Sequence, residues 1–330
     1  MGAYQTFDPL LSEQTAQEMM RVGERFGTFP MYVSEQIREG LGQGLTKRHD
    51  AAMNFVQHGG RFSRDEPFET LVARTNLFRG TYALGDDIRM PGVEPLLNHE
   101  GFYEAARSIV GGELVVPTML YANLLLPGQE LAVHTDTPEY RGMSKQQYPE
   151  WLMVVMYHSG LFESWRVPIV GAVAFFGGCD GGEFILYPDG PRADAVAVPA
   201  KHNTGVIVDV DDTFHAVDTV GGFDTPPPPA QIGMAMRYTD AGNWRLGTDE
   251  DTVGHYAWGE FRYSIQWKAY VFRDTHEKQL FEDHSDDLSP EYVREKLIED
   301  LRRRERIGAD VPDDTELALL MMDEYIQFPA

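Results

Sequence analysis

The residues best suited to chemistry lie in the stretch LAVHTDTPEY, residues 131–140. An apolar run ends there at His134, Thr135 and Asp136, so two side chains that bind metals stand one residue apart. If this stretch is extended, alternate side chains share a face, and His134 and Asp136 point the same way. An imidazole and a carboxylate at the end of one strand supply two corners of a metal site.

A possible third corner is His215, in the stretch VIVDVDDTFHAVDTV. It lies 79 residues after Asp136 (215 − 136), so only the fold can bring the three groups together. Two histidines and one carboxylate on one side of an iron ion leave three adjacent positions open, which is the facial triad of non-haem Fe(II) oxygenases. Each residue alone also has an ordinary explanation, because HxD pairs occur by chance and a histidine before a strand is often a turn or core residue.

Three zones of the chain have to position these residues. Residues 1–112 look mostly helical, with one helix expected between Ser12 and Gly27 and another over residues 100–110. Residues 113–240 hold many short β-type runs separated by turn residues, a pattern typical of a barrel or sandwich.

Residues 241–330 return to a helical pattern. Ser289 followed by Pro290 is a strong signal for the start of a helix, and a last helix is expected over residues 314–326. The three zones together predict an α+β protein in which a helical N-terminal flank and a helical C-terminal extension pack on a β core as one catalytic unit.

The segment from Tyr121 to Asp240 resembles the double-stranded β-helix, a jelly-roll or cupin-like core, of the 2-oxoglutarate and Fe(II)-dependent oxygenase superfamily. The matching pieces are NLLLPGQELAVHTD, GGEFILYP and GVIVDVDDTFHAV. The resemblance implies His134, Asp136 and His215 as iron ligands, 2-oxoglutarate and O2 as cosubstrates, and succinate and CO2 as products. Hydroxylation of a C–H bond is the default outcome, although desaturation, ring formation or demethylation stay open, as does the subfamily.

The resemblance also implies a basic residue that holds the distal carboxylate of 2-oxoglutarate. In the stretch QIGMAMRYTD the first candidate is Arg237, 22 residues after His215 (237 − 215), and Arg245 is the reserve. The alternative for Arg237 is an ordinary pair with a surface acid. Tyr121 and Asn123 share a face of the preceding strand, where the family often places a hydrogen-bonding side chain; a core tyrosine is the alternative there.

Residues 137–169 form a long connection between predicted strands. Long loops in compact domains are usually functional or disordered, and this one is too aromatic for disorder. We expect it to be part lid, part additional strand or helix, with Tyr140, Arg141 and Trp165 as candidate substrate contacts. Arg141 could meet an anionic or polar small substrate, or be an ordinary surface residue.

Charge and composition narrow the class of partner. The chain has 28 Lys and Arg against 52 Asp and Glu, a formal net charge of −24, which disfavours nucleic acid and anionic membranes and favours a small-molecule substrate. The single cysteine, Cys179, excludes an internal disulfide and fits a reducing cytoplasm. The N-terminus lacks the pattern of a secretory signal, and no apolar run has the length of a membrane span. The helical C-terminus could mediate a homodimer.

Two other classes of function use the same residues. A cupin-like hydrolase or isomerase would hold a divalent metal such as Zn2+ with the same three ligands and perform no redox chemistry. A non-catalytic β-barrel binding protein would carry the two motifs by coincidence.

Overall fold

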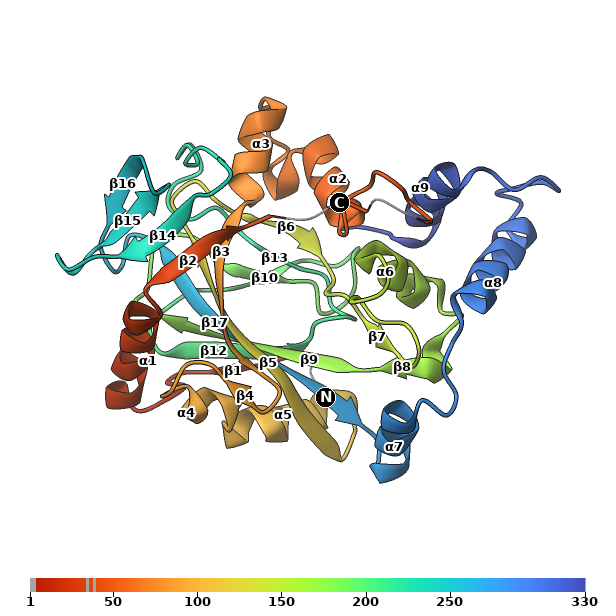
Figure 1. Cartoon of the computed structure of the whole chain (residues 1–330), viewed down its shortest axis with the longest axis horizontal. Coiled ribbons are helices and arrows are strands. Elements are labelled where there is room, and N and C mark those ends of the chain that lie inside the picture. Colours follow the sequence, from red (N-terminus) through yellow and green to blue (C-terminus); the bar gives the residue numbers. More distant parts are fainter. Residues whose placement is uncertain (1–3, 34–35, 38–39, 330) are drawn as a thin grey trace.

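The computed structural model describes residues 4–33, 36–37 and 40–329, and its main feature is an antiparallel sheet of eleven strands (Figure 1). In spatial order its strands are β1 (Tyr4–Phe7), β12 (Thr204–Asp209), β9 (Ile169–Phe176), β17 (Arg262–Phe272), β5 (Leu114–Leu125), β3 (Leu77–Leu84), β2 (Thr28–Tyr32), β14 (Ala235–Tyr238), β15 (Trp244–Gly247) and β16 (Thr252–Tyr256), with β4 (Asp87–Ile88) beside β3.

A smaller antiparallel sheet faces the middle of the large one. Its strands, in spatial order, are β11 (Val196–Val198), β10 (Phe184–Leu186), β13 (His215–Val217) and β6 (Leu131–His134). The chain passes back and forth between the sheets, from β5 to β6, to β9, to β10 and β11, to β12, to β13 and finally to β17. Side chains of both sheets line one shared cavity. A separate two-stranded ribbon pairs β7 (Glu139–Tyr140) with β8 (Arg166–Val167).

Helices surround the sheets and lie mainly at the start and end of the chain. They are α1 (Glu13–Phe26), α2 (His49–His58), α3 (Phe68–Thr75), α4 (Glu94–Leu97), α5 (Glu100–Val110), α6 (Glu150–Ser159), α7 (Thr275–Asp283), α8 (Pro290–Arg303) and α9 (Asp314–Tyr325), with short 3-10 turns η1 (Gly60–Phe62) and η2 (Glu163–Trp165).

Capping residues set the helix limits where the sequence predicted them. The Ser12 hydroxyl accepts a hydrogen bond from the Thr15 amide at the start of α1, and Gly27, with a φ of 76°, ends that helix. Ser289 caps α8 in the same way ahead of Pro290. The predictions of α1, of α5 and of the start of α8 are confirmed; α8 ends at Arg303, ahead of the Gly stop expected at residue 308, and the predicted last helix runs one residue beyond α9.

The two faces of β17 have different roles. Tyr263, Ile265 and Trp267 point outward into a buried core to which α1 and α5 contribute, with α5 below the sheet in Figure 1. By strand alternation the polar residues Arg262 and Ser264 point the other way, toward the smaller sheet. The strand therefore joins the main hydrophobic core to the polar space between the sheets.

The limits of the sheets differ from the three predicted zones. β1, β2 and β3 precede residue 113, and β17 follows residue 240, yet all belong to the large sheet. The polar inner face of β17 gives it no continuous apolar run, which is why a helical C-terminal zone was expected to begin at residue 241. Within the described residues, that zone holds β15, β16 and β17 before its first helix.

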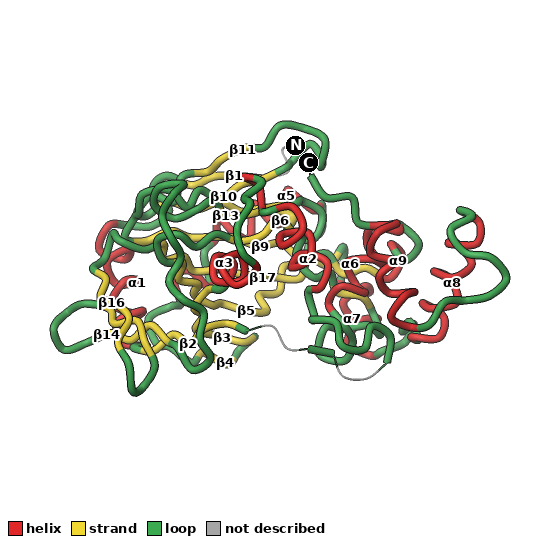
Figure 2. Tube along the Cα trace, turned by 90° about the horizontal axis from the view of Figure 1, so that it is seen from above, coloured by secondary structure: helices red, strands yellow, loops and turns green. Residues whose placement is uncertain are grey.

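Helices α6, α7, α8 and α9 gather at one end of the sheets (Figure 2). A second buried cluster lies there, in which α6, α8 and α9 contribute most of the apolar side chains. Among the residues that the structure describes, no helix combines the length and the hydropathy needed to cross a membrane.

Candidate functional site

The two histidines that the sequence singled out lie opposite each other on paired strands. β6 and β13 run antiparallel, and His134 stands directly across from His215. Their ring centroids are 4.4 Å apart. Asp136 lies two residues beyond the end of β6, and one ligand atom from each of the three residues lies within 4.8 Å of the others. The fold thus brings together the three groups of the sequence pattern.

Both imidazoles present the same nitrogen to the shared space. Nδ1 of His134 lies 2.7 Å from the carbonyl oxygen of Ala132, and Nδ1 of His215 lies 2.9 Å from that of Thr213. A carbonyl oxygen only accepts, so Nδ1–H donates in both cases and the lone pair of Nε2 stays free. Burial lowers the pKa of both histidines. Both rings are therefore neutral, the form that binds a metal ion.

The two carboxylate oxygens of Asp136 face different partners. Oδ1 lies 3.8 Å from Nε2 of His134, whereas Oδ2 accepts from the Lys268 ammonium at 2.7 Å. Burial alone would raise the pKa of Asp136, but the charge of Lys268 holds it well below its ordinary value. The ionised Oδ1 and two neutral imidazoles around one point form the donor set of a facial triad.

A half-buried arginine fixes the turn that carries Asp136. Arg48 donates to the Thr135 carbonyl oxygen at 2.9 Å and forms a two-pronged ion pair with Asp50 at 3.1 and 3.0 Å. The Asp136 amide donates to the carbonyl oxygen of Val210 at 2.7 Å. These bonds hold the turn from both sides. Arg48 could not be singled out from the sequence, because it lies in an irregular stretch ahead of α2 and belongs to no motif.

A cavity between the two sheets reaches the three candidate ligands. Tyr121 and Asn123 line its wall from β5, which is where the resemblance had suggested a hydrogen-bonding side chain. Asn123 accepts from Arg79 at 2.8 Å, and the Arg79 guanidinium lies 4.0 and 4.5 Å from the ring centres of Tyr32 and Tyr121. Arg79 has no ion pair with any carboxylate that the structure describes.

A second arginine of this cavity, Arg262, is the first residue of β17 and only 2 % exposed. It donates to the Gly182 carbonyl oxygen at 2.9 Å and to the Ser264 hydroxyl at 2.8 Å, and within the described residues it pairs with no carboxylate. Burial lowers its pKa to about 10. Gln266, which follows Ser264 on that face, has a buried Oε1 without a hydrogen-bond partner. An unpaired buried guanidinium beside an unsatisfied amide marks a place for a polar, anionic ligand.

The predicted anchor Arg237 lies away from this cavity. It belongs to β14, where it donates to the Gly247 carbonyl oxygen at 3.0 Å and to Asp249 at 2.7 Å, and it is not among the lining residues. Arg245 of β15 donates to the backbone of the same ribbon, at Thr248. The ribbon β14–β16 is inserted in the chain between β13 and β17. For this reason Arg262, the buried arginine at the cavity, follows His215 by as many as 47 residues (262 − 215).

The three candidate substrate residues of the long connection also lie elsewhere. Arg141 is 4 % exposed and forms an ion pair with Asp286 at 2.7 and 2.9 Å, while the Trp165 indole donates to the Asp286 carbonyl oxygen. Tyr140 is buried in the cluster shared with α6, α8 and α9. These residues fasten the connection to the C-terminal segment, and none of them lines the cavity at the candidate ligands.

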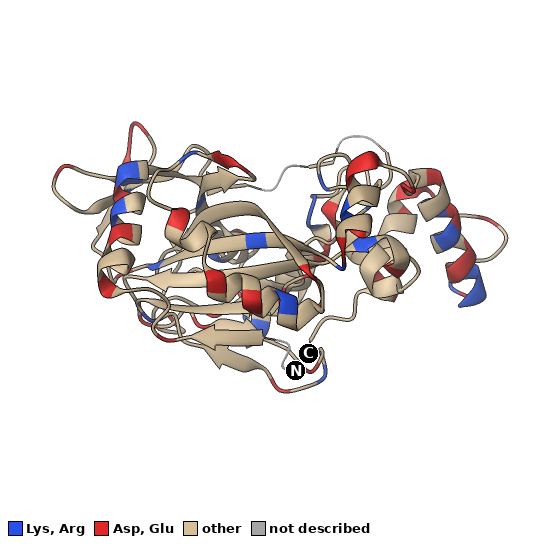
Figure 3. Cartoon of the chain, turned by 90° about the horizontal axis from the view of Figure 1, so that it is seen from below, with Lys and Arg blue, Asp and Glu red and all other residues tan. Residues whose placement is uncertain are grey.

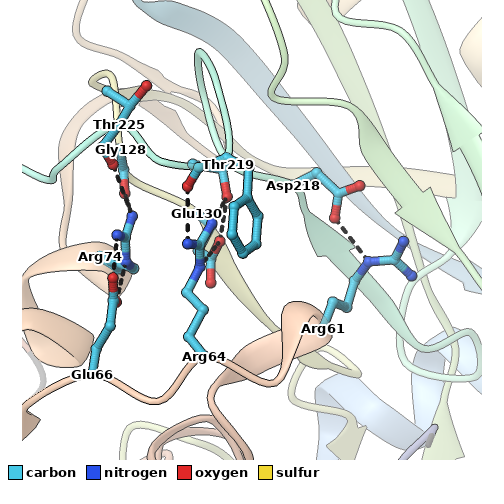
Figure 4. A network of polar contacts seen from close by, with 10 residues as sticks. Arg61, Arg64, Glu66, Arg74, Gly128, Glu130, Asp218, Thr219 and Thr225 are labelled. Carbon is cyan, nitrogen blue, oxygen red and sulfur yellow. Dashed lines mark hydrogen bonds and ion pairs between the residues drawn. The ribbon is translucent and has the colours of Figure 1, made fainter.

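The far ends of β6 and β13 are joined by a buried polar network (Figure 4). The Thr219 hydroxyl, two residues after β13, donates to Glu130 at 2.5 Å and accepts from Arg64 at 2.8 Å. Glu130 directly precedes β6, so this network ties together the two strands that carry the histidines. A half-buried pair between Arg61 and Asp218 lies beside it at 2.8 Å.

No family model matches this chain, and no curated protein matches it. Solved structures that resemble it include an oxidoreductase of the 2OG-Fe(II) oxygenase family from Burkholderia pseudomallei, at 10 % identity and a TM-score of 0.40, covering 82 % of this chain and 88 % of the other. A prolyl-4-hydroxylase from Pseudomonas putida matches at 11 % identity and a TM-score of 0.39, covering 83 % and 95 %.

A third similar structure is HygX from Streptomyces hygroscopicus, with nickel, 2-oxoglutarate and hygromycin B bound. It matches at 8 % identity and a TM-score of 0.39, covering 82 % of this chain and 83 % of the other. Identities and scores this low mark distant similarity, so the function is inferred below from the residues of this chain.

Proposed function

We propose that this chain is a non-haem, Fe(II)- and 2-oxoglutarate-dependent oxygenase. It would oxidise a C–H bond of a small molecule, with hydroxylation as the simplest outcome, and release succinate and CO2. The observation that carries this proposal is the set of two neutral imidazoles and one carboxylate beside a buried, unpaired guanidinium. That combination fits a metal ion and an anionic cosubstrate held side by side.

The order of the strands supports the same class of protein. Four strands of the large sheet (β12, β9, β17 and β5) face four of the smaller one (β11, β10, β13 and β6), and the chain alternates between them. We infer that these eight strands form a double-stranded β-helix, with the other strands and the helices as additions. The whole chain then acts as one catalytic unit, and Cys179 fits a cytoplasmic setting.

In this proposal His134, Asp136 and His215 would hold Fe(II), with the two Nε2 atoms and Oδ1 as the available donors. When bound, iron and 2-oxoglutarate supply the activation of O2. The chain itself keeps both imidazoles neutral and oriented through their Nδ1–H bonds, and Lys268 keeps Asp136 ionised. The three ligands leave the remaining iron positions free for other molecules.

Arg262 replaces Arg237 as the proposed anchor of 2-oxoglutarate. A guanidinium matches a carboxylate with two parallel hydrogen bonds, and burial strengthens such a pair because water does not compete. The Ser264 hydroxyl, between Arg262 and Gln266 at 2.8 Å from each, offers a further polar contact. A metal hydrolase or isomerase with the same three ligands has no need for this second anion site.

The test measures 2-oxoglutarate binding to iron-reconstituted protein without oxygen, by calorimetry. Arg262→Ala should weaken 2-oxoglutarate binding by about tenfold or more, because a hydrogen bond to a charged group contributes on the order of 1.5–3 kcal/mol. Iron affinity, measured on the same sample, should change little. Arg262→Lys should restore part of the loss, since a point charge replaces a planar fork.

Arg237→Ala and Arg245→Ala are the matched controls, and both should bind 2-oxoglutarate as the unaltered protein does. If Arg237→Ala loses 2-oxoglutarate binding and Arg262→Ala retains it, the anchor is Arg237 and not Arg262. If 2-oxoglutarate does not bind at all, the metal centre serves a different chemistry. If 2-oxoglutarate does bind, succinate release during a screen of small metabolites identifies the substrate.

A further inference from the structure

A second cavity, of about 350 Å³, continues the first one toward the other end of the large sheet. The same three strands line both cavities in succession. Gln266 of β17 lines the first, Lys268 lines both, and Tyr270 lines the second. Met119 of β5 and Ile169 of β9 continue the walls in the same direction. Lys268, whose ammonium contacts Asp136, therefore marks the junction at the candidate metal centre.

The inner end of this second cavity holds two lysines, of which Lys268 is already paired with Asp136 at 2.7 Å. Lys145 and Lys268 both line it, together with a single buried carboxyl group, Glu139, which is hydrogen bonded to Tyr270. Lys145 is half-buried and forms no ion pair with a carboxylate in the described part of the chain. Burial lowers the pKa of Lys145 and raises that of Glu139 to about 7, so the carboxyl group offsets only part of the positive charge.

The rest of the cavity is apolar or electrically balanced. Leu84, Val116, Met119, Phe272 and Phe281 are among its walls. At the rim, α7 carries an ion pair in which the charges of Lys278 and Glu282 cancel at 2.6 Å. A volume of about 350 Å³ suits a small molecule.

We propose that this cavity binds the substrate of the metal centre, and that the substrate is a small apolar molecule with a carboxylate or similar anionic group. Resting on the proposed oxygenase function, this places the anionic group at Lys145, beside the pair of Lys268 and Asp136, and the apolar body toward α7. The carbon atoms next to the anionic group then lie closest to the three candidate ligands. A divalent ion on Asp136 would increase the local positive charge and so favour an anion further.

The test uses 3-phenylpropanoate and its uncharged analogue 3-phenylpropanamide as probes. The protein is first loaded with Mn(II) and 2-oxoglutarate, which fill the first cavity, and binding of each probe is measured by calorimetry. The carboxylate should bind about tenfold more tightly than the amide, the effect of a charge-assisted contact in a partly dry site. Lys145→Gln should remove this preference while amide binding, 2-oxoglutarate binding and the melting temperature stay the same.

Lys278→Gln is the matched control, since it removes a lysine from the rim of the same cavity, where Glu282 already neutralises it. Its preference for the carboxylate should stay within about twofold, as expected for an exposed pair. Lys145→Arg should keep the preference and covers the case in which Lys145→Gln loses stability.

Equal binding of the two probes, failure of both to bind at millimolar concentration, or a preference that survives Lys145→Gln would overturn the proposal. The result separates it from the oxygenase function. Lys145-dependent carboxylate binding without 2-oxoglutarate binding would remove the oxygenase and leave the anion site. Binding of 2-oxoglutarate without a preference for the carboxylate probe would support the oxygenase function and exclude the anion site.

Discussion

At the scale of single residues, the candidate site differs from the rest of the fold because it contains a buried charged side chain without an ion-pair partner. Arg48 is paired with Asp50, and Arg141 with Asp286, so these arginines hold the fold together. Arg262 is as deeply buried as Arg141, more deeply than Arg48, and pairs with no carboxylate in the described residues. Because an unpaired buried charge is costly, its position points to a ligand that completes it.

The first prediction at this scale concerns the three candidate metal ligands. His134→Ala, Asp136→Ala and His215→Ala should each abolish iron binding or turnover, because each removes one donor from a site with three. The measurement is iron content after reconstitution, followed by succinate release. His202→Ala is the control: His202 accepts from the Gly177 amide and lies outside the candidate site. Full activity in any of the three variants would exclude that residue as a ligand.

Glu139 gives a prediction about pH. Burial raises its pKa from 4.5 to about 7, so the folded state holds a proton that the unfolded chain releases above pH 4.5. This group therefore disfavours folding increasingly as pH rises from about 4.5 to 7, by up to roughly 3 kcal/mol. Glu139→Gln should leave stability similar near pH 4.5 and increase it near pH 8, as measured by urea unfolding. The same stability difference at both pH values would contradict the raised pKa.

At the scale of elements, the site depends on one pair of short strands. β6 and β13 carry the two histidines at one end, and the network of Thr219, Glu130 and Arg64 joins them at the other. A strand pair this short has few ladder hydrogen bonds to fix its register, so the network supplies an additional constraint.

Thr219→Val tests that constraint. The substitution keeps the shape of the side chain but leaves Glu130 and Arg64 each short of a partner, which should cost about 1–3 kcal/mol of stability. Metal affinity should fall as well, because the two histidines lose their fixed spacing. Chemical unfolding and metal titration measure the two effects.

Arg61→Gln is the control for this variant. It breaks the neighbouring, half-buried pair with Asp218 and should cost less than about 1 kcal/mol. Metal affinity unchanged in Thr219→Val would show that the network stabilises the fold without positioning the histidines.

At the scale of the whole molecule, the surface and the site have opposite charge. The chain carries a formal net charge of −24, and acidic side chains are spread over the helices at both ends of the molecule (Figure 3). The two cavities instead gather Arg79, Arg262, Lys145 and Lys268. An anionic ligand is therefore repelled at long range and attracted only inside.

This contrast predicts an unusual dependence on salt. Salt screens the distant surface charges more than a buried contact, so the association rate of 2-oxoglutarate should rise as ionic strength increases from about 0.01 to 0.15 M. Stopped-flow binding measures the rate, and the uncharged 3-phenylpropanamide serves as a control without salt dependence. A rate that falls with salt would mean that the cationic cavity, and not the acidic surface, governs the approach.

The sequence by itself determined the parts of the protein that follow from local geometry. The spacing of His134 and Asp136 predicted that the two side chains point the same way, and capping residues fix the starts of α1 and α8. The stretch around His215 resembled a known strand context, which made it the third candidate. Tyr121 and Asn123 also lie on the cavity that the resemblance suggested.

Only the tertiary structure decided which basic side chains lie near the three candidate metal ligands. The ribbon β14–β16 separates β13 from β17 in the chain, and counting residues from His215 led to Arg237, which does not line the cavity. β17 lies between β9 and β5 through long-range pairing, which puts Arg262 and Lys268 at the cavity. Local sequence patterns set the direction of a side chain, but the strand beside it depends on pairing between distant segments, which no local pattern specifies.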